Sequence, residues 1–240
     1  QMRTLDLSAL IDEHFKVHGN WQGLKIGMVV VGWLSYLLSQ GDHRMNHVQD
    51  WAEGLQSTLA HCLAPSVRPL DFSDDRLEQV LDHLSADDSW DEFEGALSAQ
   101  TIRVYGLTPK CVRIDTTTTS GHRLCSEDGL FQFGHSKDHR KDLPQVKIVQ
   151  SALDPLGLPF SKSVVGGDCA DDPLYIPEIE RVRQSVAPSG LLYVGDSKMS
   201  AIGTRCHIHQ SQNYYLSPLS SVQVPSWRMD ELLEGVWNGT

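Results

Sequence analysis

The stretch KCVRIDTTTTSG, residues 110–121, decides how the second half of the chain is interpreted. Its aliphatic and β-branched residues favour a short buried strand, which we expect to end at Asp115. A second stretch, GLLYVGDSKMSA at residues 190–201, has the same pattern and ends its apolar run at Asp196. Taken alone, either aspartate is better explained as an ordinary strand-end or helix-capping residue, because Asp is common at such turns.

The order of elements between the two aspartates favours a different interpretation. After residue 106 the pattern predicts the element order βββαβαβ, with strands at 111–115, 146–152, 158–165, 191–194 and 214–219. The second and third strands form a hairpin around the turn at 154–157, and a right-handed crossover follows. Ribonuclease H-like domains use this arrangement, with the fourth strand beside the first. We therefore expect a ribonuclease H-like mixed sheet in which Asp115 and Asp196 stand side by side.

Two adjacent carboxylates form an acidic pocket that suits divalent metal ions. Magnesium prefers hard oxygen ligands and keeps several waters, so two or three carboxylates are sufficient to hold it. We predict that Asp115 and Asp196 bind Mg²⁺ or Mn²⁺, with a pair of ions in the intact site. Asp168 and Asp171 also invite a ligand interpretation, but a Gly-rich turn leading to a helix cap explains them equally well.

Residues 1–106 are expected to form a separate all-helical domain. Residues 24–39 are apolar on nearly all sides and predict a buried central helix that ends at Gly41. Apolar residues at three- and four-residue spacing from 48 to 59 predict a further helix. Ser73 has the character of an N-cap, with acidic residues in the first turn behind it, and another helix is expected from near Ser89. No residue of this domain indicates chemistry, so packing or docking is its expected role.

Composition and charge limit the classes of protein to consider. The 240 residues have a net charge of −11, which argues against a generic nucleic-acid binder. The acidic excess lies in residues 1–100, whereas residues 101–150 are mildly basic. The five cysteines are scattered without a C-x-x-C pair, which predicts reduced thiols and a cytoplasmic location. No apolar run is long enough for a bilayer, and no secretory signal opens the chain.

A polar, basic stretch follows the first strand of the second domain. Its sequence is FGHSKDHRKDLPQ, residues 133–145. One interpretation is a loop beside the acidic pocket whose cations contact phosphates and are oriented by Asp138. The other is a solvated polar connection between strands. For the first interpretation, the predicted DNA-contacting residues are His135, Lys137, Arg140, Lys141 and, two positions after the second aspartate, Lys198.

Several motifs in the same order resemble the DDE transposases of bacterial insertion sequences. These are RIDTTTTSGH, GHSKDHRKDLPQ, the segment GGDCAD at 166–171, and YVGDSKMSA followed by YYLSPL. DEHFKVHGNWQGL and RPLDFSDDRLEQVLD resemble the helical domain that precedes the catalytic core in one subgroup. The resemblance covers nearly the whole chain. Lys141 departs from it, because relatives usually have proline there.

This resemblance implies roles for the two aspartates. Asp115 would be the first catalytic acid and Asp196 the second, in metal-dependent phosphoryl transfer on DNA. The third acid of the family is a glutamate beyond an inserted segment, so residues 107–240 would be the first part of a DDE domain. Glu231 and Glu234 do not match the glutamate motif, and we expect them on a helix surface. Intact relatives would bind terminal inverted repeats and target DNA, and would act as homodimers.

Three hypotheses follow from the sequence. The first is a transposase that cleaves and joins DNA strands at the ends of its element. The second is a catalytically incomplete remnant that acts only as a DNA- or protein-binding module. The third is a structure-selective nuclease of the same fold, because folds are shared between functions.

Overall fold

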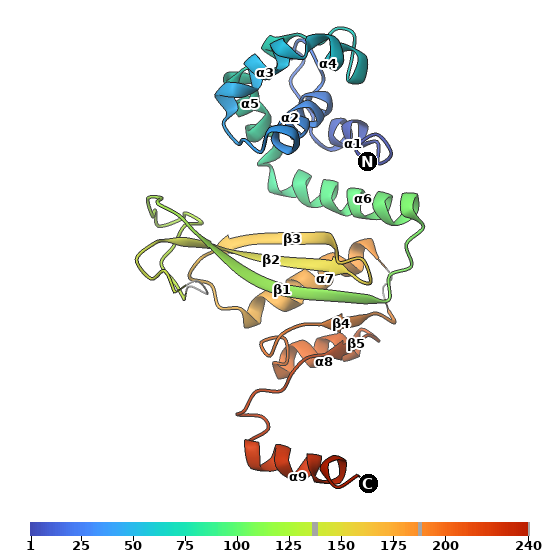
Figure 1. Ribbon diagram of the computed structural model, residues 1–240, viewed down its shortest axis with the longest axis vertical. Helices are drawn as coiled ribbons and strands as arrows, with labels where there is room; N and C mark the ends of the chain where they lie inside the picture. Colours follow the sequence, from blue (N-terminus) through green and yellow to red (C-terminus); the bar gives the residue numbers. More distant parts are fainter. Residues whose placement is uncertain (136–138, 187–188, 240) are drawn as a thin grey trace. The chain divides into compact units, whose positions relative to one another are not determined.

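The computed structural model describes residues 1–135, 139–186 and 189–239. The chain divides into two compact units, Gln1–Leu107 and Thr108–Thr240. Helices alone build the first unit, and the second contains a five-stranded mixed sheet with helices (Figure 1). The protein is therefore a mixed α/β protein in which a helical unit precedes the sheet.

The helical unit is assembled around α2, Ile26–Gln40. Val29 and Tyr36 of this helix are buried in a core shared with the helices around it. As predicted, α2 ends before Gly41, whose φ of 61° is a left-handed conformation that glycine adopts without strain. The other helices are α1 (Leu7–His14), η1 (Met45–His47), α3 (Val48–Gly54), α4 (Gln56–Cys62), η2 (Pro69–Phe72), α5 (Asp74–Leu84) and α6 (Asp87–Tyr105).

Two details of this unit test the sequence predictions. The N-cap is confirmed, because Oγ of Ser73 accepts a hydrogen bond from the backbone N–H of Arg76 at the start of α5. The single helix predicted across residues 48–59 is wrong. It is divided into α3 and α4 at Leu55, whose side chain is largely exposed and so contributes little to an apolar stripe.

The sheet has the strand order β3-β2-β1-β4-β5. Its strands are β1 (Cys111–Ser120), β2 (Gln145–Leu153), β3 (Leu158–Gly166), β4 (Leu192–Val194) and β5 (Tyr214–Leu216). β2 is antiparallel to both of its neighbours, whereas β4 is parallel to β1 and β5 is parallel to β4. The predicted hairpin and the predicted placement of the fourth strand beside the first are both confirmed.

Strand β1 is twice as long as predicted, and Asp115 does not end it. The run from Thr116 to Thr119 continues the strand and pairs with β2 up to Ser120. Thr116 and Thr118 are buried, whereas Thr117 and Thr119 are exposed. This alternation suits threonine, whose β-branched methyl packs on a sheet while its hydroxyl tolerates solvent. Asp115 therefore projects from the middle of a strand, on the exposed face.

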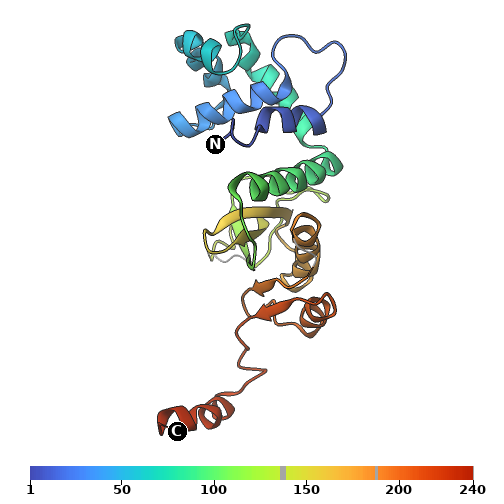
Figure 2. The ribbon, with the colours of Figure 1, turned by 90° about the vertical axis from the view of Figure 1, so that its right-hand side faces the viewer.

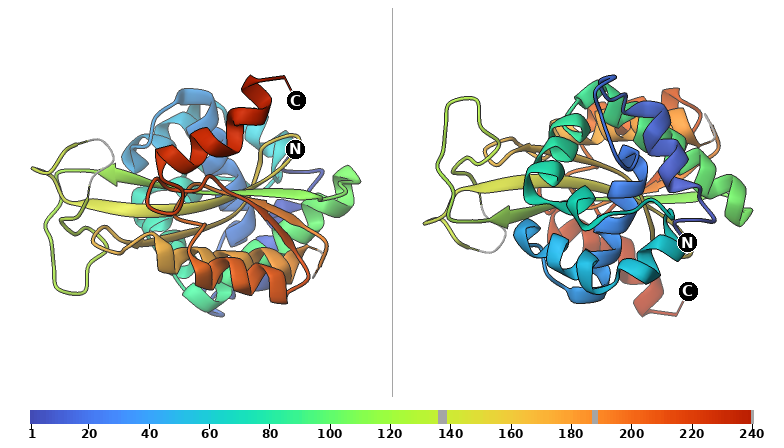
Figure 3. Two further views of the ribbon diagram at one scale, coloured as in Figure 1. Left: turned by 90° about the horizontal axis from the view of Figure 1, so that it is seen from below. Right: turned by 90° about the horizontal axis from the view of Figure 1, so that it is seen from above.

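Helices α7 (Tyr175–Ser185) and α8 (Ile202–Gln210) lie on the same side of the sheet (Figures 2 and 3). α7 contacts β2 and β3, and α8 contacts β5. Their fully buried side chains include Ile179, Val182 and Ile208. Ile176 and Val186 have helical spacing with these residues of α7 and would be expected on the same apolar side, but they are only partly buried. Tyr175 and Glu178, fully buried, take the corresponding places on the packed side.

The final helix, α9 (Ser226–Trp237), contributes nothing to the core. None of its residues is buried, and Trp227 and Trp237 expose about two thirds of their surface, at 66% and 64%. Glu231 and Glu234 lie on its exposed surface, as predicted. Among the described residues, no helix combines the length and apolar character needed to cross a bilayer.

Candidate active site

Asp115 lies within β1, and Asp196 lies two residues after the end of β4, the parallel neighbour of β1. The register between β1 and β4 pairs Cys111 with Leu192 and continues to the pair Arg113 and Val194. Asp115 follows Arg113 by two residues, and Asp196 follows Val194 by two residues. Asp115 is exposed and Asp196 is partly exposed, so both carboxylates are accessible from solvent. Oδ1 of Asp115 accepts a 2.8 Å hydrogen bond from the backbone N–H of Thr116.

The carboxylate of Asp196 is held by two donors. The hydroxyl of Tyr175 donates a 2.6 Å hydrogen bond to Oδ1, and the backbone N–H of Lys198 donates a 2.9 Å bond to the same atom. Burial raises the pKa of Tyr175, and the hydrogen bond to Asp196 raises this pKa further. The negative charges of Asp115 and Asp171 add to the effect. The hydroxyl therefore stays protonated among three carboxylates and acts as a donor.

Asp171 has a partner of its own. Oδ1 of Asp171 lies 2.6 Å from Nζ of Lys147, a β2 side chain that is almost completely buried. The Lys147 ammonium also donates to the carbonyl of Cys169. Asp168 is exposed. Across residues 1–135, 139–186 and 189–239, no three His, Cys, Asp or Glu side chains form a group that could hold a metal ion.

The predicted DNA-contacting residues are exposed where the structure describes them. His135, Lys141 and Lys198 are exposed, and Lys137 lies outside the described residues, as does Asp138. The guanidinium of Arg140 binds both oxygens of Asp142, at 2.9 and 2.8 Å. This hydrogen-bonded pair lowers the pKa of Asp142 to about 2. Asp142 is therefore the acid that orients Arg140 among the described residues.

Gln145 fastens the loop of His135 to the glycine-rich segment. Its side chain is fully buried, and Nε2 donates to the carbonyls of His135 and Gly167, at 3.0 and 2.9 Å. The backbone at this junction is crowded, because a Cβ added to Gly134 would lie 2.1 Å from the carbonyl oxygen of Gly167. Only glycine allows such an approach. The loop that contains His135 and the glycine-rich segment at Gly167 are thus held in contact beside the first residue of β2.

Sequence reasoning missed four residues that support this region. Each of the four is buried and directs a polar group at a specific partner. They are Gln145, Lys147, Tyr175 and Glu178. Tyr175 directly follows the Asp172–Leu174 turn that leads into α7, and its spacing of four residues from Ile179 is a signal that could have found its buried position. A buried lysine or glutamate has no comparable signal, because its partners come from segments distant in the sequence.

Residues Cys206, His207 and His209 do not form a metal site. Nε2 of His207 lies 2.7 Å from Oε1 of Glu180, and Cys206 is a free, exposed thiol. Glu180 also accepts a 2.7 Å hydrogen bond from Arg183. These contacts join α7 to α8 and have a structural role.

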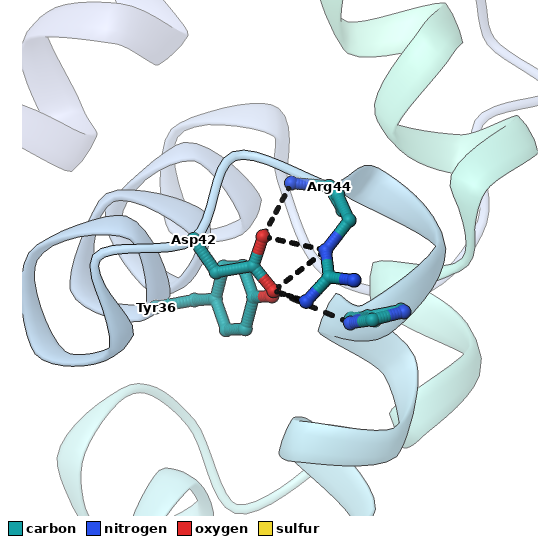
Figure 4. A network of polar contacts seen from close by, with 4 residues as sticks. Tyr36, Asp42 and Arg44 are labelled. Atoms are coloured by element: carbon teal, nitrogen blue, oxygen red, sulfur yellow. Dashed lines mark hydrogen bonds and ion pairs between the residues drawn. The ribbon is translucent and has the colours of Figure 1, made fainter.

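The helical unit contains a polar network of its own (Figure 4). Asp42 accepts hydrogen bonds from the hydroxyl of Tyr36 and from the guanidinium and backbone N–H of Arg44, and lies 3.2 Å from His47. Hydrogen bonds from Arg44 first, and then from Tyr36, hold the pKa of Asp42 well below its usual range. A cavity of about 560 Å³ adjoins the network. Because both oxygens of Asp42 accept hydrogen bonds from residues near and after the end of α2, the network fixes the end of this helix.

Comparisons with known proteins gave structural neighbours only. No protein-family model and no curated protein sequence matches the chain. A piggyBac transposase synaptic complex with hairpin DNA aligns at a TM-score of 0.47 and 13% identity over 97% of this chain. The chain spans about half, 51%, of that transposase chain. A Mos1 transposase paired-end complex with the left transposon end aligns at a TM-score of 0.33 and 9% identity. This alignment covers 98% of the present chain and 82% of the Mos1 transposase chain.

Proposed function

We propose that this chain is a DNA transposase, or a part of one, that uses a metal-dependent site at Asp115 and Asp196 to cleave and join DNA strands at element ends. One observation supports the proposal: β1 and β4 are parallel neighbours, and Asp115 in β1 and Asp196 just after β4 each follow the last registered pair, Arg113 and Val194, by two residues. The ordered motifs that resemble DDE insertion-sequence transposases supply the reaction class.

The sheet supports a ribonuclease H-like core. The order β3-β2-β1-β4-β5, with only β2 antiparallel to its neighbours, is the arrangement expected for that fold. α7 crosses from β3 to β4 and covers one face, which leaves the exposed face of β1 to Asp115. A fold of this kind also serves nucleases, so the transposase assignment rests on the motifs rather than on the topology.

The residues present suit a divalent cation with hard oxygen ligands. Oδ1 of Asp196 already accepts two hydrogen bonds, and within the described part of the chain Oδ2 accepts none. The carboxylate of Asp115 comes from the adjacent strand. Asp115 and Asp196 would therefore hold Mg²⁺ or Mn²⁺ with water completing the coordination. When bound, the metal would activate the attacking oxygen and stabilise the leaving oxygen.

The exposed cations around the site would bind the DNA backbone. Lys198 follows Asp196 by two residues and is exposed, so its ammonium is suited to a phosphate beside the acids. His135 and Lys141 are exposed on the loop that Gln145 ties down. Arg140 is paired with Asp142, which fixes the orientation of the guanidinium and offsets its positive charge.

A cleavage assay tests this function. The substrate is a labelled duplex carrying the inverted repeat that flanks the coding sequence, with Mg²⁺ or with EDTA. We expect Mg²⁺-dependent nicking that falls to background in Asp115→Asn and in Asp196→Asn, and that is kept in Asp128→Asn, a matched change at an exposed loop aspartate. Joining of the cut end to a target plasmid identifies a transposase, and cutting without joining identifies a nuclease. Nicking that survives both active-site substitutions contradicts the proposal.

A binding module without catalysis is the second candidate. The observation that favours it is α9, which exposes Trp227, Leu232 and Trp237 and buries none of its residues. Exposed apolar side chains along one short helix are typical of protein–protein contacts. In this case the duplex would remain uncut in the presence of Mg²⁺.

A further inference from the structure

Tyr175 occupies an unusual position for a tyrosine. It is the first residue of α7 and is completely buried, yet its hydroxyl reaches Oδ1 of Asp196, a carboxylate that is partly exposed. The bond of 2.6 Å is short for a neutral donor, as expected when the acceptor is charged. A side chain from the core thus makes direct contact with one of the two acids.

The two donors at Asp196 come from different elements. Tyr175 approaches from α7, and the backbone N–H of Lys198 approaches from the turn after β4. Because both bind Oδ1, they fix the rotation of the carboxylate. The remaining oxygen, Oδ2, is left without a hydrogen-bond donor from the described residues. Supporting hydrogen bonds of this kind orient metal-binding side chains in proteins.

The chemistry of the donor fits this role. A lysine or arginine in the same place would bring a positive charge beside the acids and would compete with a cation. A tyrosine hydroxyl fixes the carboxylate without adding charge. Tyr193 on β4 shows the contrast, because it is also fully buried but its hydroxyl has no partner among the described residues. Burial alone therefore does not require the contact that Tyr175 makes.

We propose that Tyr175 is a positioning residue that turns Oδ2 of Asp196 toward a divalent cation. This inference rests on the proposed function, since it assumes that Asp196 is a metal ligand. A purely structural role is the alternative, in which the hydrogen bond only satisfies a buried hydroxyl. The two roles differ in their effect on metal affinity and not in their effect on stability.

Mn²⁺ binding separates the two roles. The full chain is titrated with Mn²⁺, and free Mn²⁺ is followed by electron paramagnetic resonance in wild type, Tyr175→Phe, Tyr193→Phe and Asp196→Asn. We expect Tyr175→Phe to raise the Kd for Mn²⁺ by about 10- to 100-fold, as for other residues that orient a ligand. Tyr193→Phe also removes a buried tyrosine hydroxyl, but one that makes no hydrogen bond to Asp196, and it should leave the Kd unchanged. Thermal unfolding monitors the fold of each variant.

The failure of each proposal has a distinct signature. An unchanged Kd in Tyr175→Phe, together with weakened binding in Asp196→Asn, overturns the positioning role and leaves the metal site standing. Equal binding by wild type and Asp196→Asn removes the metal site and the positioning role together. If Tyr175→Phe does not fold, Lys198→Pro removes the other donor to Oδ1 at an exposed position. It should also weaken Mn²⁺ binding, and an unchanged Kd there overturns the inference.

Discussion

Nζ of Lys147 lies 2.6 Å from Oδ1 of Asp171, which joins the sheet strand β2 to the segment that leads into α7. The lysine side chain is 7% exposed and the aspartate side chain 18%. Such a pair is not a large source of stability, because desolvation offsets the attraction between the charges. Loss of one partner is costly, however, since the other charge remains buried.

We predict that Asp171→Ala lowers the free energy of unfolding by about 3 kcal/mol, because it leaves the Lys147 ammonium without its carboxylate. The double variant Lys147→Met with Asp171→Ala should recover much of this loss. Urea unfolding followed by circular dichroism measures both. If the double variant is as unstable as Asp171→Ala alone, the buried charge is not the cause of the loss.

Glu178 is the second buried charge that should control stability. It is fully buried, and its carboxylate accepts hydrogen bonds from Ser151, Ser161 and Ser163, the last at 3.0 Å. Glu178→Ala leaves these hydroxyls without their acceptor and creates a cavity, so we expect a loss of about 3 kcal/mol or more in urea unfolding. Glu178→Gln keeps the volume and should cost less.

The matched control for this prediction is Glu180, two residues along the same helix and in a more exposed environment. Glu180→Gln changes a partly exposed glutamate of the same helix, which pairs with Arg183 and His207. We expect it to cost less than about 1 kcal/mol, because partly exposed ion pairs contribute little. Equal losses in Glu180→Gln and Glu178→Ala would show that the serine cluster has no special importance.

A pH dependence is expected at the start of β1. The hydrogen bond from Arg113 lowers the pKa of Asp154 below its usual value, against the opposing effect of burial. The folded state therefore binds this proton less readily than the unfolded state. The resulting stability is present above the unfolded pKa, about 4 for Asp. It is lost as the pH falls through the folded pKa.

Asp154→Asn removes this contribution. At pH 7 the variant should be less stable than wild type, and the difference should shrink as the pH is lowered toward 3. Urea unfolding at several pH values measures it, with Asp128→Asn as an exposed control from the same unit. A difference that is constant with pH would show that the Asp154 charge does not contribute.

Helix α9 should be almost irrelevant to the stability of the unit that contains it. Because Trp237 exposes 64% of its surface, Trp237→Ala should change the free energy of unfolding by less than about 0.5 kcal/mol. Ile179→Ala, in the fully buried part of α7, should cost about 2 to 5 kcal/mol. A large loss in Trp237→Ala would show that α9 packs on this chain in solution.

Local patterns predicted much of the fold for a physical reason. Strand alternation, the Ser73 cap and the glycine after α2 depend on neighbours within a few residues, so the sequence displays them directly. The strand conformation of the threonine run, Thr116 to Thr119, was harder to predict, because this half of β1 is polar in composition. Thr116 and Thr118 are buried because they lie on the covered face of the sheet. A local sequence pattern does not reveal that this face is covered.

The candidate site was predictable in part. The two aspartates are singled out because each follows a short apolar run, and the placement of β4 beside β1 follows from the order of elements. The groups that support them depend on contacts between residues far apart in sequence. Tyr175 meets Asp196, and Glu178 meets serines of β2 and β3, through folding alone. No spacing rule indicates such pairs.

The acid pair should make stability depend on divalent metal. A ligand that binds only the folded state stabilises it by about 2.7 kcal/mol at 100 times its Kd. We therefore expect Mg²⁺ or Mn²⁺ to raise the Tm of wild type, and Asp115→Asn to abolish this increase. Without metal, Asp115→Asn should be neutral or stabilising, because it removes one of two negative charges on neighbouring strands. Differential scanning calorimetry with and without Mg²⁺ gives both values. A wild-type Tm that is indifferent to metal would contradict the shared site.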